Sequence, residues 1–497
     1  MKRRKFIQLT GGTVLMGSTF PLILQSCKDD LDGMMRPRVA PRVEDGPFNV
    51  ELPRLPSLPA TNASLTAQHT TATVFKNKTS SVLSYHAGDL LGPTLRAHRG
   101  ETVQVSFQNQ LSEPSNIHWH GLITPAEMDG HPTDIAPAGG SLNYTFPIVQ
   151  RAGTYWYHPH PDLLTAKQTY RGLAGFFIVS DNEEQAIGLP SGEFELPLVI
   201  QDKQADVAGD FPYNPSSIDL MNGMMGERIL VNGIHSPLAE VLPRTYRLRV
   251  LNGSNARIYN IALSNSANFT IIGTDGGLLA APETQQTILL APGERVDLLV
   301  SFAGMAAGTE LYLHSKAFPG SEYQGKQDFN VLKFKVISGQ TDNFPIPALL
   351  DPPVVINESE ATNTRFFDIS NDGGHGGHGG HGGGSISHNI NEKVYKHDRI
   401  DEVIDFGATE IWTFDNTNGV DPHPMHLHGA LFQILDRTGG RAQVFPHEKG
   451  WKDTVLVMPG EKVRIIARFE QYKGIFVFHC HNLEHEDTGM MLQMEIK

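Results

Sequence analysis

Cysteine is scarce in this chain: only two occur among 497 residues, Cys27 and Cys480. More than one disulfide is therefore excluded, and with it a fold that depends on a disulfide framework. Basic residues are also in the minority, because 40 Lys and Arg stand against 54 Asp and Glu, which gives a net charge of −14. Binding to phosphate backbones needs a basic surface, so we expect no nucleic acid among the partners.

Long apolar runs are absent after the N-terminal segment, where no stretch reaches the roughly 18 apolar residues of a membrane-spanning helix. The beginning of the chain differs. Residues 2–5 are basic and residues 6–24 form an interrupted apolar stretch, which is the pattern of an export signal. Arg3 and Arg4 resemble the twin-arginine motif of an export route that carries folded proteins.

Residues 24–27, Leu-Gln-Ser-Cys, resemble a lipobox, in which the cysteine is lipidated after cleavage. We therefore predict that residues 1–27 are an export signal with a lipobox and that Cys27 carries a lipid anchor. The predicted location is the periplasm, or the outer membrane or cell surface as a lipoprotein. Gln25 is atypical at its position, so cleavage nearby beside an incidental cysteine is the alternative.

The chain is rich in glycine and proline, with 49 and 32 residues, and both favour turns over long helices. Residues 28–46, which are rich in proline and charge, are predicted to be a tether. Beyond them, short β-branched and aromatic runs alternate with turns. Residues 101–107, 246–250 and 462–468 show the period of two that is typical of half-buried strands. The sequence therefore predicts an all-β fold of sandwiched antiparallel sheets.

A repeat divides these strands into three units. Residues 95–110, 238–253 and 400–416 share one pattern, which is a short extended run, a turn and a strand that ends near Asn. The first and third units continue into His-x-His pairs, whereas the middle unit has none. We therefore predict three consecutive β-sandwich domains with metal chemistry in the first and last. Their predicted bounds are residues 47–190, 191–350 and 351–497.

Four His-x-His pairs carry the strongest functional signal. In a strand, residues i and i+2 share a face, so each pair can aim two imidazoles at one place. One pair could arise by chance, but four pairs in matched positions of a repeat indicate a metal site with eight imidazoles. The pairs are His118 with His120, His158 with His160, His426 with His428, and His479 with His481.

Cys480 identifies the metal. It lies between two strand-paired histidines, so its side chain points to the opposite face and can reach a different metal ion. His485 and Met490 follow at loop spacing, and His423 precedes the third pair. One Cys, two His and a distant Met are the ligands of a blue-copper electron-transfer centre. Zinc favours four tetrahedral nitrogen, thiolate or oxygen ligands, and a thioether suits it poorly.

The metal motifs stand complete and in order: His-x-His-Gly, His-x-His, His-x-x-His-x-His and His-Cys-His-x-x-x-His-x-x-x-x-Met. Over residues 50–497 the chain resembles the multicopper oxidase family, most closely its bacterial three-domain laccases and cuprous oxidases. The resemblance implies three cupredoxin-like Greek-key domains. It also implies four copper ions, one of type 1, one of type 2 and two of type 3, and dioxygen as the oxidant that is reduced to water.

The resemblance also assigns a role to each ligand. Cys480, His423 and His485 would bind the type 1 copper, with Met490 as the axial ligand. His118 and His426 would bind the type 2 copper. The remaining six imidazoles would bind the type 3 pair, and they belong to His120, His158, His160, His428, His479 and His481.

Two acidic residues match positions that deliver protons in related oxidases. Asp129 follows the first His pair, and Glu486 directly follows His485. Together with Cys480, whose chain neighbours would pass its electron to the type 3 coppers, they are the predicted catalytic residues. Asp453 resembles an aspartate that orients a type 1 histidine.

The electron donor is open between a small molecule, such as a phenol or aromatic amine, and a metal ion, cuprous copper. The Gly/His-rich loop at residues 373–384 resembles the insert of cuprous oxidases. It holds His375, His378 and His381 but no Met, although thioethers suit cuprous ions. Asp421 stands where a relative uses a Met for substrate copper. Both departures weaken the cuprous interpretation, and a plain linker is the alternative for the loop.

Two other classes are weaker alternatives. Copper nitrite reductases share this domain type, but they usually have two domains per chain and lack the type 3 histidines. A non-catalytic copper-binding relative would have lost ligands, whereas none is missing from this sequence. We expect a monomeric enzyme.

Overall fold

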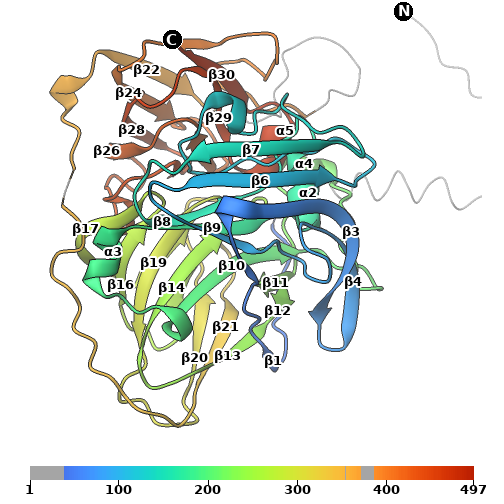
Figure 1. The fold of residues 1–497 in the computed structure, drawn as a ribbon, viewed down its shortest axis with the longest axis vertical. Helices are drawn as coiled ribbons and strands as arrows, with labels where there is room; N and C mark the ends of the chain where they lie inside the picture. The colour runs from blue at the N-terminus through green and yellow to red at the C-terminus, as the bar shows by residue number, and fades with distance from the viewer. Residues whose placement is uncertain (1–38, 353, 371–385) are drawn as a thin grey trace, which may run out of the picture. The chain divides into compact units, whose positions relative to one another are not determined.

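The computed structural model describes residues 39–352, 354–370 and 386–497. Strands dominate these residues, and the predicted all-β fold is confirmed. Six sheets pack in pairs as three successive sandwiches, coloured from blue through green and yellow to red in Figure 1. The predicted export signal, Cys27, residues 28–38 of the predicted tether and the Gly/His-rich loop lie outside the described residues.

The first sandwich follows the predicted alternation. In β6 (Thr102–Asn109), Val103, Val105 and Phe107 point into the core while the residues between them face outward. One sheet has the order β4 (Lys78–Ser84), β3 (Ala63–Phe75), β6 and β7 (Ser141–Pro147). The other has the order β2 (Ser57–Pro59), β5 (Thr94–His98), β9 (Gly175–Ser180) and β8 (Gly153–Tyr157).

The middle sandwich has the largest core, and its two sheets have the most strands. Its seven-stranded sheet has the order β12 (Ile234–His235), β11 (Arg228–Val231), β10 (Glu195–Lys203), β14 (Thr245–Asn252), β19 (Arg295–Ser301), β16 (Phe269–Thr274) and β17 (Gly277–Gln285). Its six-stranded sheet has the order β1 (Val50–Glu51), β13 (Pro237–Val241), β21 (Phe329–Val336), β20 (Glu310–Ser315), β15 (Tyr259–Leu263) and β18 (Thr287–Leu290).

The third sandwich carries the Cys480 motif in its five-stranded sheet. That sheet has the order β23 (Glu402–Ile404), β30 (Met491–Ile496), β29 (Gly474–Cys480), β25 (His423–Leu427) and β27 (Thr454–Val457). The facing sheet has the order β22 (Asn363–Asp368), β24 (Thr409–Asp415), β28 (Glu461–Arg468) and β26 (Phe432–Gly439). Their apolar faces enclose one core, which includes Cys480 itself.

Helices are short. The α-helices of the described residues are α2 (Thr165–Arg171), α3 (Asn182–Ile187), α4 (Ser217–Asn222) and α5 (Leu483–Asp487). The 3-10 turns are η1 (Ala60–Asn62), η2 (Ala126–Met128), η3 (Gly192–Phe194), η4 (Glu358–Glu360) and η5 (Pro446–Glu448). α5 packs against both α2 and α4, which places one helix from each sandwich beside the Cys480 motif. No helix of the described residues is long and apolar enough to cross a membrane.

Two expectations need correction. The sheets are mixed rather than purely antiparallel, since β3 pairs with β6, β5 with β9 and β10 with β14 in parallel. The connections that run from one sheet of a sandwich to the other bring these strands back in the same direction.

The described part of the predicted tether, residues 39–46, does not run free of the domains. Ala40 donates its amide to the Tyr323 carbonyl at 2.7 Å, and Glu44 donates to the Glu227 carbonyl at 2.8 Å. Val50 and Glu51, expected in the first domain, instead form β1 at the edge of a middle-domain sheet. Proline-rich composition suggested a tether, but this extended segment satisfies its backbone groups against the middle sandwich.

Candidate metal centres

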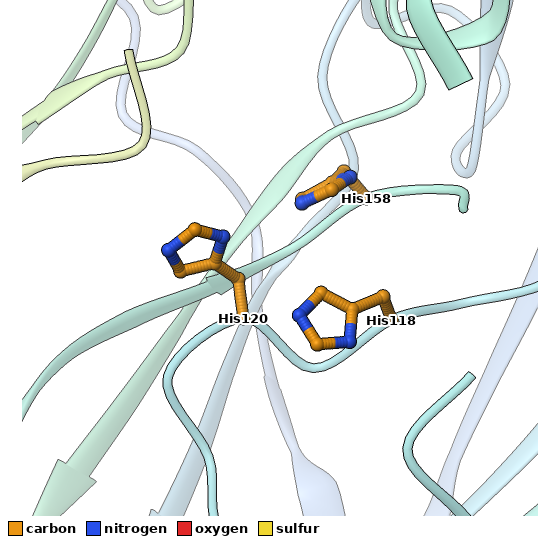
Figure 2. Close-up of side chains that lie close together, drawn as sticks. All are labelled: His118, His120 and His158. Carbon is orange, nitrogen blue, oxygen red and sulfur yellow. The ribbon is translucent and has the colours of Figure 1, made fainter. Parts of the chain in front are cut away.

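The eight paired histidines gather in one buried cluster between the first and third sandwiches. His118 and His158 face each other across a bridge between two segments, and His426 pairs with His479 between β25 and β29. Figure 2 shows the rings of His118, His120 and His158 turned toward a common space. The eight residues are at most 2% exposed, and we call them the imidazole cluster; they are His118, His120, His158, His160, His426, His428, His479 and His481.

The cluster needs both domains, because its closest ring contacts cross between them. The His118 ring stacks on His428 and the His120 ring on His426, each with a centroid separation of 3.8 Å. The Nε2 atom of His479 lies 3.2 Å from the Nε2 atoms of both His160 and His428. Three groups of ligand atoms within 4.8 Å of one another could each hold a metal ion: His118, His120 and His158; His118, His426 and His428; and His160, His428 and His479.

Backbone carbonyls fix the orientation of several rings. The Nδ1 atoms of His118, His158 and His426 donate to carbonyl oxygens at 2.7, 2.9 and 2.8 Å. Among the described residues, the Nε2 atom of each of these rings is buried without a hydrogen-bond partner. One nitrogen held by an acceptor and the other turned to a shared space is the arrangement of metal-bound histidines. The residues present therefore fit a metal cluster.

His120 is held the other way round. Its Nε2 donates to Asp453 Oδ1 at 2.9 Å, while Nδ1 lacks a partner among the described residues. Asp453 was expected to orient a type 1 histidine, and this interpretation is wrong: its carboxylate holds His120 and its carbonyl holds His426. His120 and Asp453 are 333 positions apart in the sequence, so local spacing cannot predict that they are partners.

Burial favours the neutral form of the imidazoles of His158 and His160. It is the main cause that lowers the pKa of His158 to about 3 and that of His160 to about 4. Their neighbouring imidazoles add to this, because two adjacent rings cannot both carry charge at low cost. A neutral imidazole is the form that binds a metal ion, so the cluster is ready to bind metal near neutral pH.

Both predicted proton-delivering acids contact the imidazole cluster. Asp129 is 1% exposed and accepts from His428 Nδ1 at 2.7 Å; burial raises the pKa of its carboxyl to about 8. Glu486 Oε2 lies 3.1 Å from His479 Nδ1. Burial opposes its ionised form, but the imidazoles of His160 and His479 outweigh burial and place its pKa below the ordinary value. Neither residue is an exposed loop acid.

The second group lies on the other side of β29. Cys480 Sγ is 3.5 Å from His423 Nδ1 and 3.8 Å from His485 Nδ1, and those two nitrogens are 3.3 Å apart. All three side chains are buried, and we call them the Cys–His group. Burial raises the pKa of the Cys480 thiol, so the thiolate needs a cation to stabilise it. The predicted separation of Cys480 from its two histidine neighbours is what the structure has.

Met490 lies beside the Cys–His group. Its amide donates to the His485 carbonyl at 2.9 Å and its carbonyl accepts from the Cys480 amide at 3.0 Å, so its side chain starts next to both. Met490 is fully buried in the core cluster that holds Cys480. Asp421, which stands where a relative uses a Met for substrate copper, is 7% exposed two residues before His423.

Sequence reasoning missed two neighbours of His485. His388 stacks on its ring with a centroid separation of 3.8 Å and an angle of 16°. The Met221 carbonyl, at the end of α4 in the middle sandwich, accepts from His485 Nε2 at 2.9 Å. Neither residue stands at a recognisable spacing from the metal motifs, so only the folded structure identifies them.

Comparison with known proteins agrees with this geometry. Three family models, each described as multicopper oxidase, match residues 66–184, 200–336 and 367–497. The chain is 34% identical to the laccase of Bacillus subtilis (strain 168) over 463 residues, which cover 82% of this chain and 88% of the relative. It is also 32% identical to the cell division protein FtsP of Xenorhabdus nematophila, covering 82% of this chain and 84% of the relative.

Solved structures show the same likeness. The multicopper oxidase McoA from the hyperthermophile Aquifex aeolicus has a TM-score of 0.80 and 33% identity, and the match covers 92% of this chain and 100% of that one. A bacterial laccase-like multicopper oxidase from Ochrobactrum sp. has a TM-score of 0.80 at 32% identity, over 90% and 100% of the two chains. With the sandwiches, the imidazole cluster and the Cys–His group in place, the chain belongs to the multicopper oxidase family and is a copper oxidoreductase.

Proposed function

We propose that this enzyme is a laccase-like oxidase, which oxidises phenols or aromatic amines one electron at a time and reduces dioxygen to water. The observation that carries the proposal is the placement of two ligand groups on opposite faces of residues 479–481. In this proposal the Cys–His group and Met490 would hold one type 1 copper, and the imidazole cluster would hold one type 2 and two type 3 coppers. Copper, when bound, supplies the one-electron chemistry at the first group and dioxygen reduction at the second.

The chain itself supplies the path between the two groups. Cys480 is covalently bonded to His479 and His481, whose rings belong to the imidazole cluster. A second connection shortens the path on one side, because His479 Nδ1 donates to the Cys480 carbonyl at 3.1 Å. An electron that leaves the Cys480 sulfur therefore reaches the cluster through a few bonds and crosses no solvent.

Asp129 and Glu486 supply protons in this proposal. Each carboxyl contacts an imidazole of the cluster and lies out of solvent. Asp129, whose pKa burial raises to about 8, holds a proton at neutral pH. Glu486, whose pKa its imidazole neighbours lower, is ionised there and would relay a proton rather than store one. The two acids approach from opposite domains. The complete burial of the eight imidazoles keeps bulk water away from the cluster.

An electron donor would approach the Cys–His group from the side where α4 contacts His485. His485 is buried, but its Nε2 is one hydrogen bond from the half-buried Met221 near the C-terminal end of α4. A donor that lies against α4 needs no direct copper contact, because outer-sphere transfer through the imidazole and its hydrogen bond suffices. This undemanding requirement favours a broad class of small aromatic donors.

Cuprous ion is the second candidate donor, and one observation favours it. Met221 is followed by Met224 and Met225, which places three thioether residues in the segment that covers His485. Thioethers are ligands that suit cuprous ions. The Gly/His-rich loop, predicted to bind metal as an alternative to a plain linker, adds imidazoles at residues 375, 378 and 381.

Absorption spectra of copper-loaded protein test the copper assignment. We expect an intense band at about 600 nm from the Cys480 thiolate and a shoulder at about 330 nm from the type 3 pair. Metal analysis should give four copper ions per chain. A protein that takes up copper and shows neither feature would overturn the assignment.

Oxygen-consumption rates test the donor. Wild type, a variant without residues 373–384 and Met221→Leu are each compared with a phenol and with cuprous ion, and Met458→Leu serves as the control for a methionine change elsewhere. A laccase keeps its phenol rate in all variants. A cuprous oxidase loses rate with cuprous ion alone when the loop or Met221 is changed.

Export and anchoring are part of the proposal. We infer a twin-arginine signal and a lipid on Cys27, which place the enzyme in the periplasm or at the cell surface. Replacing Cys27 with Ser should release the enzyme from the membrane fraction while Arg3→Lys with Arg4→Lys blocks export. An unmodified Cys27 in the mass of the mature protein would refute the anchor.

A further inference from the structure

Arg295 of the middle sandwich reaches all three domains with one side chain. Its Nε donates to the Thr154 carbonyl of the first domain at 2.8 Å. Nη1 and Nη2 donate to Oδ1 and Oδ2 of Asp453 in the third domain at 2.8 and 2.5 Å. The remaining donors bind the carbonyls of Gly293 and Asp275. All five N–H groups of the guanidinium are thus used, and the side chain is fully buried.

The buried charges around this residue are paired with one another. Lys452, beside Asp453 in the sequence, contacts Asp275 and Glu294, both at 2.9 Å. The middle and third domains therefore hold each other through two buried cations and three buried carboxylates. Removing one partner from such a network leaves an uncompensated charge, which costs much more than an exposed pair.

Two glycines show how tightly this network is fitted against the imidazole cluster. A Cβ on Gly293, which has φ +84°, would lie 3.1 Å from ring atoms of His120 and His481. A Cβ on Gly121, which has φ +82°, would lie 2.4 Å from Asp453 Oδ2 and 2.6 Å from Arg295 Nη2. The glycine of the His-x-His-Gly motif thus leaves room for the Arg295–Asp453 pair, and the middle domain forms a wall of the cluster.

We propose that Arg295 is a positioning residue for the copper cluster: it fixes Asp453, which selects the nitrogen that His120 presents. With Nε2–H donated to Asp453 Oδ1, the lone pair of His120 is on Nδ1, and that atom faces the cluster. His118, His158 and His426 donate from Nδ1 and present Nε2 instead. The middle domain, which has no His-x-His pair, therefore helps to determine the ligand geometry.

The geometry explains why a bidentate cation is needed. Both oxygens of Asp453 are held by Arg295, so the carboxylate plane cannot rotate away from His120. A lysine keeps the charge but has a single ammonium, which cannot hold both oxygens and the Thr154 carbonyl at once. Only the Thr454 hydroxyl, 2.9 Å from Oδ1, then still holds the carboxylate, so Asp453 can turn and His120 loses the fixed acceptor that specifies its tautomer.

The metal-free protein gives the first test, which does not depend on copper. We expect 15N spectra of selectively labelled wild type to show His120 protonated at Nε2, with the signal identified by its loss in His120→Gln. Arg295→Lys should convert it to a mixture of tautomers. Wild-type His120 protonated at Nδ1, or an unchanged signal in Arg295→Lys, would overturn the proposal.

The copper-loaded protein gives the second test, which rests on the proposed copper assignment. Arg295→Lys should weaken type 3 copper affinity about 10–100-fold, the usual effect of losing such a supporting partner, and reduce the 330 nm shoulder. The 600 nm band and the KM for the donor should be unchanged while kcat falls.

Arg437→Lys is the matched control. Arg437 is equally buried and binds two carboxylates, but these are Glu448 and Glu461 of the third domain. Equal loss of type 3 copper in both variants would reduce Arg295 to a stabilising residue and refute the positioning role. If Arg295→Lys does not fold, the same measurements on Asp453→Glu and the His120 tautomer of the wild type test the proposal instead. Wild type that binds no copper refutes the proposed function, whereas the tautomer still tests Arg295.

Discussion

The two metal groups are neighbours along residues 479–485, but the chain builds them differently. The Cys–His group takes its three side chains from the third sandwich alone. The imidazole cluster takes four rings from the first sandwich and four from the third, and Arg295 of the middle sandwich helps to orient one of them. The first group therefore takes its ligands from one domain and only a hydrogen bond to His485 from the middle domain, whereas the second takes its ligands from two domains and depends on how all three dock.

Replacing Cys480 with Ser should have the largest effect, because it should remove the function of the Cys–His group and leave the imidazole cluster intact. The thiolate is the ligand that gives the blue colour and is the start of the electron path, so the band at about 600 nm and turnover should both disappear. The shoulder at about 330 nm should remain, because the imidazole cluster keeps all its rings. His160→Ala is the matched change on the other side, and it should keep the blue band and lose turnover. Donor oxidation by Cys480→Ser would contradict the electron path.

Asp129→Asn should have the next largest effect on turnover. The buried Asp129 carboxyl has its pKa raised to about 8, so it holds a proton below that pH and loses it as the pH rises further. Wild-type kcat should therefore fall above about pH 8, and the asparagine, which cannot deliver a proton, should lower kcat about 10²–10⁴-fold. The exposed Asp134, changed to Asn, should leave the rate within about twofold. An unchanged pH profile in Asp129→Asn would exclude the role.

Glu195→Gln tests the docking of the first and middle domains. Glu195 accepts from Arg96 of the first domain and Arg249 of the middle domain, both at 2.9 Å. Burial raises its pKa, but these arginines and Arg247 outweigh burial and lower it from 4.5 to about 2. The ionised carboxylate therefore stabilises the fold above about pH 4.5, and this stability is lost as the pH falls toward 2.

The predicted cost of that substitution is about 3 kcal/mol at pH 7, since each pKa unit corresponds to about 1.4 kcal/mol. Urea unfolding of the metal-free protein at pH 7 and pH 3.5 measures it. The variant should lose stability at pH 7 and show a smaller difference between the two pH values. Glu183→Gln, a change of an exposed neighbour on α3, is the control, and equal losses in both variants would contradict the argument.

Met490→Leu should have the smallest effect. An axial thioether tunes the reduction potential of a blue-copper site and is not needed to form it. The blue band should persist, the potential should rise, and kcat should change less than about tenfold. Met494→Leu, a buried methionine of β30, should leave the potential unchanged. A potential that stays constant in Met490→Leu would remove Met490 from the ligand set.

Local patterns allowed the all-β fold and the grouping of ligands to be predicted. The i, i+2 spacing of the histidines and the central position of Cys480 predicted the grouping correctly. The structure differs in one respect, because only His426 and His479 lie within strands and the other six rings lie outside them. Long-range partners could not be predicted in this way. Arg295 reads as an ordinary strand residue, and its partner Asp453 lies 158 positions further on.

The errors have the same cause. Residues 39–46 have the composition of a tether, but backbone hydrogen bonds to a distant part of the chain decide their place. The role of Asp453 was assigned from a neighbouring motif, whereas its carboxylate contacts a ring of another domain. Composition and spacing report on neighbours in sequence, and these residues are positioned by neighbours in space.

The single turn of α5 has a consequence for how this protein can vary. Four consecutive side chains of this turn contact four different parts of the molecule. Glu484 accepts from the Met224 amide of the middle domain, His485 belongs to the Cys–His group, Glu486 faces the imidazole cluster, and Asp487 accepts from an amide of the first domain. Because successive helical residues are rotated by about 100°, inserting or deleting one residue here would turn every side chain to the wrong neighbour. A change in the length of this segment would therefore disturb both metal groups and both domain contacts at once.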